Sequence, residues 1–156
     1  MTNILVNQEQ IVGKVLKLFI SEEDSSTRRI KNKLYLDIAG VIGDKFYNKD
    51  INRSVLISSL KSYNIADENN ISMKYGALGE NILMNYNPYH LTEGTQIKIG
   101  EVILEISQHC TLCKSLTKVN TKLPKILKND RGVFAKVIKS GFIYQNDTVI
   151  IYHLEV

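Results

Sequence analysis

The sequence predicts a mainly β protein, folded as a closed or partly closed barrel with a few short helices. Three observations predict this class. Apolar and polar residues alternate with period two over most of the chain, short β-rich runs are separated by glycine-containing turns, and helical periodicity is confined to short segments. The 156 residues show no linker or internal repeat and suit one hydrophobic core, so we expect residues 1–156 to form a single domain.

The N-terminal half contains three predicted strands and one predicted helix. Alternating apolar residues indicate the first two strands, and Gly40 and Gly43 end the second. A short apolar run then indicates a buried strand, and the serines after it suit a helix N-cap. The predicted elements are strands at 13–20, 34–38 and 55–57, a helix capped by Ser58 or Ser59, and a loop at 66–70.

The C-terminal half is organised around a hairpin. Two β-rich runs flank the tight turn Gly100–Glu101, which predicts a hairpin over residues 96–107. The remaining predicted elements are a helical turn at 113–119, strands at 133–139 and 148–154, and turns at 140–141 and 146–147.

Composition and charge exclude several classes of protein. The chain is 44% hydrophobic, and no apolar run approaches the ~20 residues that cross a bilayer, so we expect no membrane partner. Two cysteines without an export signal favour the reducing cytoplasm. The net charge of +4 comes from lysines that are not interleaved with aromatic residues, so we expect no nucleic-acid partner. A local anion site for a small phosphorylated ligand is compatible with this charge.

The two cysteines, Cys110 and Cys113, lie three residues apart directly after the strand predicted at 102–107. If Cys113 opens a helix, the helix dipole and the neighbouring Lys114 favour its thiolate, the form that ligates soft metals or accepts a sulfur atom. His109 is a candidate proton carrier beside them. The alternatives are small core residues or a surface redox pair, whereas a zinc site would need about four ligands.

Three glycine-containing segments are weaker candidates, since most such segments are simply turns. Residues 76–82 permit a close backbone approach to a ligand and present Glu80 and Asn81 at a strand. Residues 39–45 place Lys45 near Arg53, where both cations suit a phosphate. The segment that starts at Arg131 adds a further cation.

Taken in order, these segments resemble the MOSC domain, named for the C-terminal domain of molybdenum cofactor sulfurases. The resemblance runs from about Gly13 to Val149 and implies a MOSC-type β-barrel. Two positions depart from the commonest pattern: Leu112 replaces a proline, and Cys110 replaces an arginine. The matching motifs are Gly40–Asp44, Arg53–Val55, GALGENI at residues 76–82, Ile99–Gly100 with Ile106–Gln108 before Cys113, and Gly132–Gly141.

The resemblance implies a cytoplasmic protein that binds molybdenum cofactor (molybdopterin) or handles sulfur destined for it. Cys113 would ligate molybdenum or carry a persulfide, with Cys110 and His109 as further catalytic candidates. The implied cofactor-binding residues are Lys45, Arg53, Gly79, Glu80, Asn81 and Arg131.

Two mechanisms remain open within that class. In a sulfur carrier, an external cysteine desulfurase, itself dependent on pyridoxal phosphate, supplies the sulfur. In a molybdenum-dependent oxidoreductase, an electron-transfer partner is needed, since nothing in the chain resembles a flavin or iron–sulfur site. The alternatives outside that class are a non-enzymatic module that binds a small anion or a protein, and a dithiol redox protein with a reversible Cys110–Cys113 disulfide.

Overall fold

The computed structural model describes residues 6–22, 28–110 and 114–155. The strands are β1 (Val6–Ser21), β2 (Arg28–Lys31), β3 (Lys33–Asp37), β4 (Gly40–Val41), β5 (Val55–Ser59), β6 (Ile82–Met84), β7 (Gln96–Ile99), β8 (Val102–His109), β9 (Val133–Lys139), β10 (Gly141–Tyr144) and β11 (Thr148–Glu155). The helices are α1 (Leu60–Glu68), α2 (Lys114–Val119) and α3 (Leu123–Ile126), with 3-10 turns η1 (Ile51–Arg53) and η2 (Pro88–His90).

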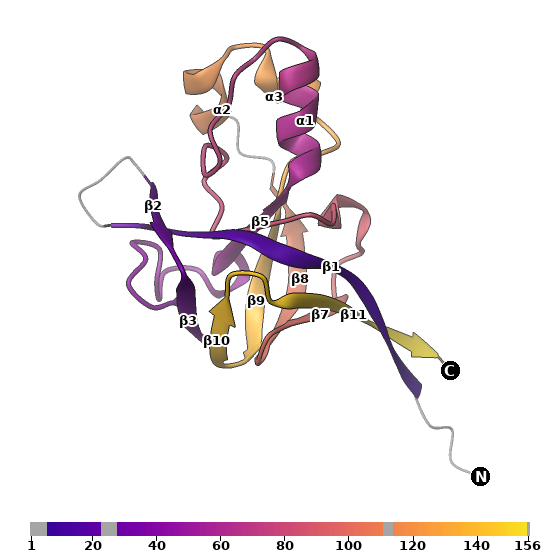
Figure 1. The fold of residues 1–156 in the computed structure, drawn as a ribbon. Coiled ribbons are helices and arrows are strands. Elements are labelled where there is room, and N and C mark those ends of the chain that lie inside the picture. The colour runs from indigo at the N-terminus through magenta and orange to yellow at the C-terminus, as the bar shows by residue number, and fades with distance from the viewer. Residues whose placement is uncertain (1–5, 23–27, 111–113, 156) are drawn as a thin grey trace.

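Seven strands close into a barrel in the order β11-β7-β8-β9-β5-β6-β1, and a β11–β1 pairing joins the two ends (Figure 1). β2 continues the sheet beyond β1, and β10, β3 and β4 form a second, smaller sheet. The barrel pairs are antiparallel except β5–β6, which is parallel because α1 provides the crossover between them. The predicted mainly β barrel is therefore confirmed.

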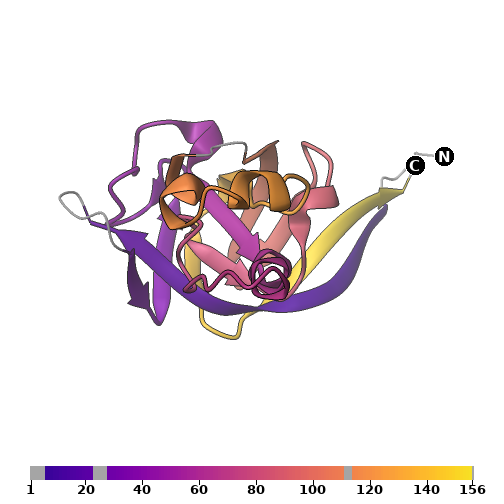
Figure 2. The same ribbon diagram turned by 90° about the horizontal axis from the view of Figure 1, so that it is seen from above.

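The alternation of side chains along β1 and β6 separates two hydrophobic clusters. Leu18 and Ile82 belong to the core inside the barrel, whereas their neighbours Phe19 and Leu83 belong to a second cluster. This second cluster includes Tyr63, Leu116, Leu123 and Leu127, and it packs the three helices against the barrel wall. The helices thus gather at one end of the barrel (Figure 2).

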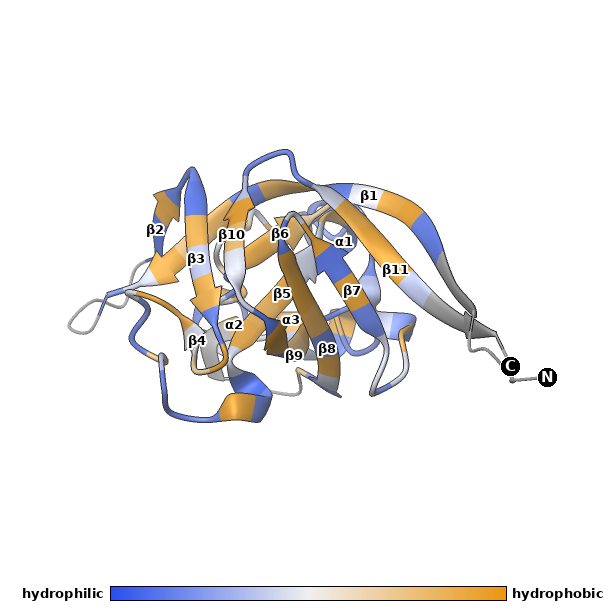
Figure 3. Ribbon diagram, turned by 90° about the horizontal axis from the view of Figure 1, so that it is seen from below, coloured by the Kyte–Doolittle hydropathy of each residue, from blue (hydrophilic) through white to orange (hydrophobic). Residues whose placement is uncertain are grey.

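Most predicted elements are present, with three corrections at their boundaries. Ser59 caps α1 as predicted, and its side chain accepts a hydrogen bond from the Lys61 backbone N–H, but α1 runs to Glu68, into the predicted loop. β1 begins at Val6 rather than Gly13 because its first half pairs with β11 as a two-stranded ribbon that extends beyond the barrel (Figure 3). Gly141 begins β10 rather than lying in a turn, because it pairs with Leu36 of β3. No helix in the described ranges is long and apolar enough to cross a membrane.

Candidate functional site

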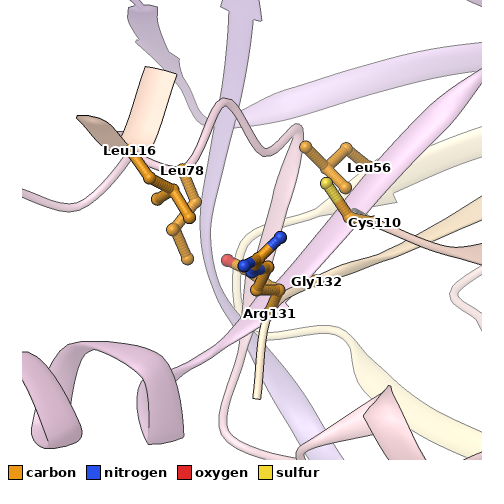
Figure 4. A pocket seen from close by; sticks show the side chains of 7 residues that line it. Leu56, Leu78, Cys110, Leu116, Arg131 and Gly132 are labelled. Carbon is orange, nitrogen blue, oxygen red and sulfur yellow. The ribbon is translucent and has the colours of Figure 1, made fainter. Parts of the chain in front are cut away.

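A small pocket lies where the end of the barrel meets α2. Its cavity volume of about 10 Å³ is roughly that needed for one water molecule. Arg131 reaches into the space between Leu78 and Cys110 (Figure 4). The lining residues are Leu56, Ser58, Leu78, Cys110, Leu116, Arg131 and Gly132.

A backbone hydrogen bond and side-chain packing hold Cys110 at this pocket. It directly follows β8, and its backbone N–H donates a 2.9 Å hydrogen bond to the carbonyl oxygen of Gly132 at the start of β9. The residue is 7% exposed and packs with Leu56 and Phe134. The sulfur is therefore mostly buried but borders a cavity. Cys113, the predicted reactive cysteine, lies outside the described residues, so its role stays a prediction.

Two of the predicted cations lie near Cys110. Arg131 lines the pocket, and its Nη2 donates a 2.5 Å hydrogen bond to the carbonyl oxygen of Pro124, which ties α3 to the start of β9. Arg53 is exposed, with its guanidinium 5.5 Å from the centre of the Phe134 ring. Since Phe134 packs with Cys110, both guanidinium groups lie in the surroundings of this sulfur.

The predicted ligand residue Glu80 lies in a closed polar cluster instead. Its side chain is fully buried, and its Oε2 accepts 2.5 Å hydrogen bonds from the hydroxyls of Ser58 and Tyr63. Among the described residues, its Oε1 has no hydrogen-bond partner. Burial raises the pKa of Glu80, because a charged carboxylate is poorly solvated there, and burial beside Glu80 raises the pKa of Tyr63. The Ser58 hydroxyl connects this cluster to the pocket.

Hydrogen bonds from the Asn81 side chain connect the segment around Glu80 to strands β5 and β1 of the barrel. Its Oδ1 accepts a hydrogen bond from the Leu56 backbone N–H (3.1 Å), and its Nδ2 donates to the carbonyl oxygen of Phe19 (3.2 Å). The same Nδ2 donates to Oδ1 of Asp44 (3.3 Å), and Arg28 lies 3.6 Å from that oxygen. The Asn81 side chain therefore makes three hydrogen bonds to described residues, and of these partners only Leu56, through its backbone N–H, also lines the pocket.

Gly79 is required by the backbone and by close packing. Its φ of +86° is in the left-handed region, and a Cβ at this position would lie 3.3 Å from Nη2 of Arg28. The Arg28 guanidinium is largely buried, which lowers its pKa, although Asp44 and Glu80 favour its charged form. The Gly79–Asn81 segment thus lies against a buried ionic cluster.

Lys45 and His109 are not among the residues that line the pocket. Lys45 follows β4, and its Nζ lies 5.3 Å from the centre of the Phe46 ring. His109 is exposed and stacks on Tyr89 at 4.3 Å between ring centres. Their predicted roles stay predictions.

The sequence-based interpretation did not assign Ser58 a role in the site. The sequence predicts Ser58 or Ser59 as the cap of α1; Ser59 is the cap, and Ser58 donates a hydrogen bond to Glu80 and lines the pocket. The sequence does indicate a buried role for Ser58. It follows three apolar residues of a short strand, where a buried hydroxyl needs a polar partner.

Comparisons with known proteins identify the family. The family model named MOSC domain matches residues 42–150. No curated protein matches the sequence. The fold is similar to that of YuaD from Bacillus subtilis, with a TM-score of 0.83 and 17% identity over 96% of this chain and 100% of YuaD.

Two further solved structures share the fold. YiiM from Geobacillus stearothermophilus is 15% identical over 92% of this chain and 75% of its own, with a TM-score of 0.65. YiiM from Escherichia coli is 16% identical over 88% of this chain and 69% of its own, with a TM-score of 0.66. These identities show a shared fold, whereas the family match covers most of the sequence. The chain therefore belongs to the MOSC domain family.

Proposed function

We propose that this protein carries sulfur for the molybdenum cofactor, with the cysteines after β8 as the sulfur site. Membership of the MOSC family indicates a function related to this cofactor. The observation that carries the finer proposal is the position of Cys110, whose sulfur borders a pocket of about 10 Å³ that Arg131 also lines. That volume suits one additional atom rather than a substrate molecule.

The chemistry of loading is a thiol exchange that needs no external oxidant. The cysteine thiolate attacks the outer sulfur of a donor persulfide, a new S–S bond forms, and the donor leaves as its thiolate. The product is a cysteine persulfide on this protein. Arg131 lies where its positive charge favours an anionic sulfur group at Cys110.

The cysteines and the two arginines suit the metal and the phosphate of the molybdenum cofactor. A thiolate is a soft metal ligand, and guanidinium groups such as those of Arg53 and Arg131 match a phosphate. The cavity formed by the described residues is too small for a pterin ring, so the ring system would lie outside it, toward the exposed Arg53. The bound cofactor would supply a molybdenum centre that exchanges two electrons.

Persulfide formation provides the direct test. The protein is incubated with glutathione persulfide, and intact-mass spectrometry compares the wild type with Cys110→Ala, Cys113→Ala and the double variant. We expect a gain of one sulfur atom in the wild type and in one single variant, and no gain in the double variant. Absence of sulfur uptake by the wild type would refute the carrier proposal.

Cofactor binding needs a separate measurement. The wild type, Arg53→Ala and Cys113→Ala are purified from a host that makes the cofactor, and molybdenum and pterin are quantified. We expect the wild type to contain both, with less in each variant. Molybdenum-dependent reduction of N-hydroxylated compounds without sulfur uptake would assign the protein to the oxidoreductase class instead.

A further inference from the structure

A second and larger cavity lies away from the cysteine pocket. It is a groove of about 470 Å³ between the β2–β3 hairpin and the loop that follows β4. Ile20 and Leu34 are its buried lining residues, and Ile42 and Gly43 contribute from the loop. The groove and the cysteine pocket share no lining residue. The volume of the groove lies in the range typical of small-molecule sites, about 300–1,000 Å³.

Two aromatic residues, Tyr35 and Phe142, line this groove, and a third, Tyr144, lies beside Phe142. Tyr35 of β3 is paired with Phe142 of β10, and Lys33 with Tyr144. The centres of the Tyr35 and Phe142 rings are 4.9 Å apart, and those of Phe142 and Tyr144 are 5.9 Å apart. Tyr35 and Tyr144 are 40% and 47% exposed. Ring surface is thus available to a flat ligand.

The charged side chains that line the groove are all positive among the described residues. Lys31 and Lys33 both line it, and Nζ of Lys33 lies 5.3 Å from the centre of the Phe142 ring. Within the described part of the chain, neither lysine forms an ion pair and no acidic side chain lines the groove. Asp37, on the same face of β3, accepts hydrogen bonds from the Tyr47 hydroxyl (2.6 Å) and the Ala39 N–H (2.9 Å).

We propose that this groove binds a planar aromatic anion of about the size of a mononucleotide. The ring system packs against Tyr35 and Phe142, and a phosphate lies at Lys31 and Lys33. A second copy of the chain is a poorer occupant, because a two-fold contact would bring the same lysines together without a carboxylate between them. A long nucleic-acid strand would need more cations than these two lysines provide.

The test uses adenosine 5′-monophosphate, adenosine and ribose 5-phosphate as probes, with binding measured by calorimetry. We expect the monophosphate to bind at least about tenfold more tightly than either part, because only it engages both the rings and the lysines. Amide chemical shifts should change at Gly43 and Phe142 and remain constant at Gly132.

Variants distinguish the contribution of the lysines, which would bind the phosphate, from that of the aromatic rings, which would bind the base. The double variant Lys31→Ala, Lys33→Ala should lower the affinity for the monophosphate by about tenfold and leave adenosine binding unchanged. Phe142→Leu, which keeps an apolar side chain, should weaken both ligands. Lys61→Ala on the exposed face of α1 is the matched control, and thermal melting verifies that each variant is folded.

Several results would overturn the proposal. One is the absence of monophosphate binding at millimolar concentration, and another is a set of shift changes confined to residues outside the groove. An affinity for oligothymidylate that rises with its length would identify a nucleic-acid strand as the occupant instead. Co-sedimentation with phosphatidylserine vesicles that depends on Lys31 and Lys33 would identify a lipid surface.

Discussion

The Glu80 cluster and the Cys110 pocket lie next to each other along β5, but their surroundings differ. Glu80 is fully buried, and its polar neighbours Ser58 and Tyr63 bond it within the fold. Cys110 borders a cavity, and the exposed Arg53 lies near it across Phe134. Both regions contain motif residues, yet one is closed by hydrogen bonds and the other borders a small cavity.

Because of this difference, we expect substitutions in the Glu80 cluster to affect mainly stability and substitutions at the Cys110 pocket to affect mainly the proposed chemistry. Substitutions in the closed cluster leave buried polar groups without partners, which costs folding free energy. Substitutions beside the pocket remove one buried sulfur or an exposed cation, which costs less folding free energy. We therefore expect the largest effects on unfolding at Glu80 and the smallest at Arg53.

The largest expected effect is that of Glu80→Ala. The substitution leaves the hydroxyls of Ser58 and Tyr63 without their acceptor in a buried site, and we expect a loss of about 3–5 kcal/mol in the free energy of unfolding. Urea denaturation measures it. Glu68→Ala, at the exposed end of α1, is the control and should change stability by less than about 0.5 kcal/mol. Equal losses in the two variants would remove the distinction between the regions.

A smaller expected effect is a dependence of the free energy of unfolding on pH, caused by Glu80. Because burial raises the pKa of Glu80 above its ordinary value of 4.5, the folded state binds this proton more tightly than the unfolded state. The associated stability is fully present below pH 4.5 and is lost as the pH rises through the folded pKa. Glu80→Gln cannot titrate, so its stability relative to the wild type should increase from pH 4.5 to pH 8. A difference that stays constant over this range would contradict the assignment.

Cys110→Ala should cost about 1 kcal/mol, since it removes one buried atom from the contact with Leu56 and Phe134. Thermal and urea unfolding measure this loss. Cys110→Ser should cost more, because it places a hydroxyl among apolar side chains. If Cys110→Ala loses as much free energy of unfolding as Glu80→Ala, Cys110 is mainly a structural residue.

The smallest expected effect on stability is that of Arg53→Met. An exposed cation–π contact contributes about 0.5–1 kcal/mol, and methionine keeps part of the packing on Phe134. We nevertheless expect lower pterin content in protein from a cofactor-producing host, because the phosphate would lose a guanidinium. Unchanged pterin content would place the phosphate elsewhere.

Local patterns predicted several elements closely. The 96–107 hairpin appears as β7 and β8, and β9 has the predicted bounds of Val133–Lys139. Ser59 caps its helix as expected. Such features depend on neighbouring residues, since alternation, turns and caps are set within a few positions of the chain. The parallel β5–β6 pair was not predicted, because nothing near Ile82 in the sequence specifies its partner.

The sequence by itself determined the β-barrel class, the family motifs and the two cysteines after a strand. Only the tertiary structure decided that Glu80 is enclosed by Ser58 and Tyr63, and that Tyr35 and Phe142 meet beside Lys31 and Lys33. The physical reason is distance along the chain: β3 and β10 are more than a hundred residues apart, and their contact depends on the closure of the whole barrel. Burial and charge, and with them the chemistry of a side chain, follow from such long-range contacts.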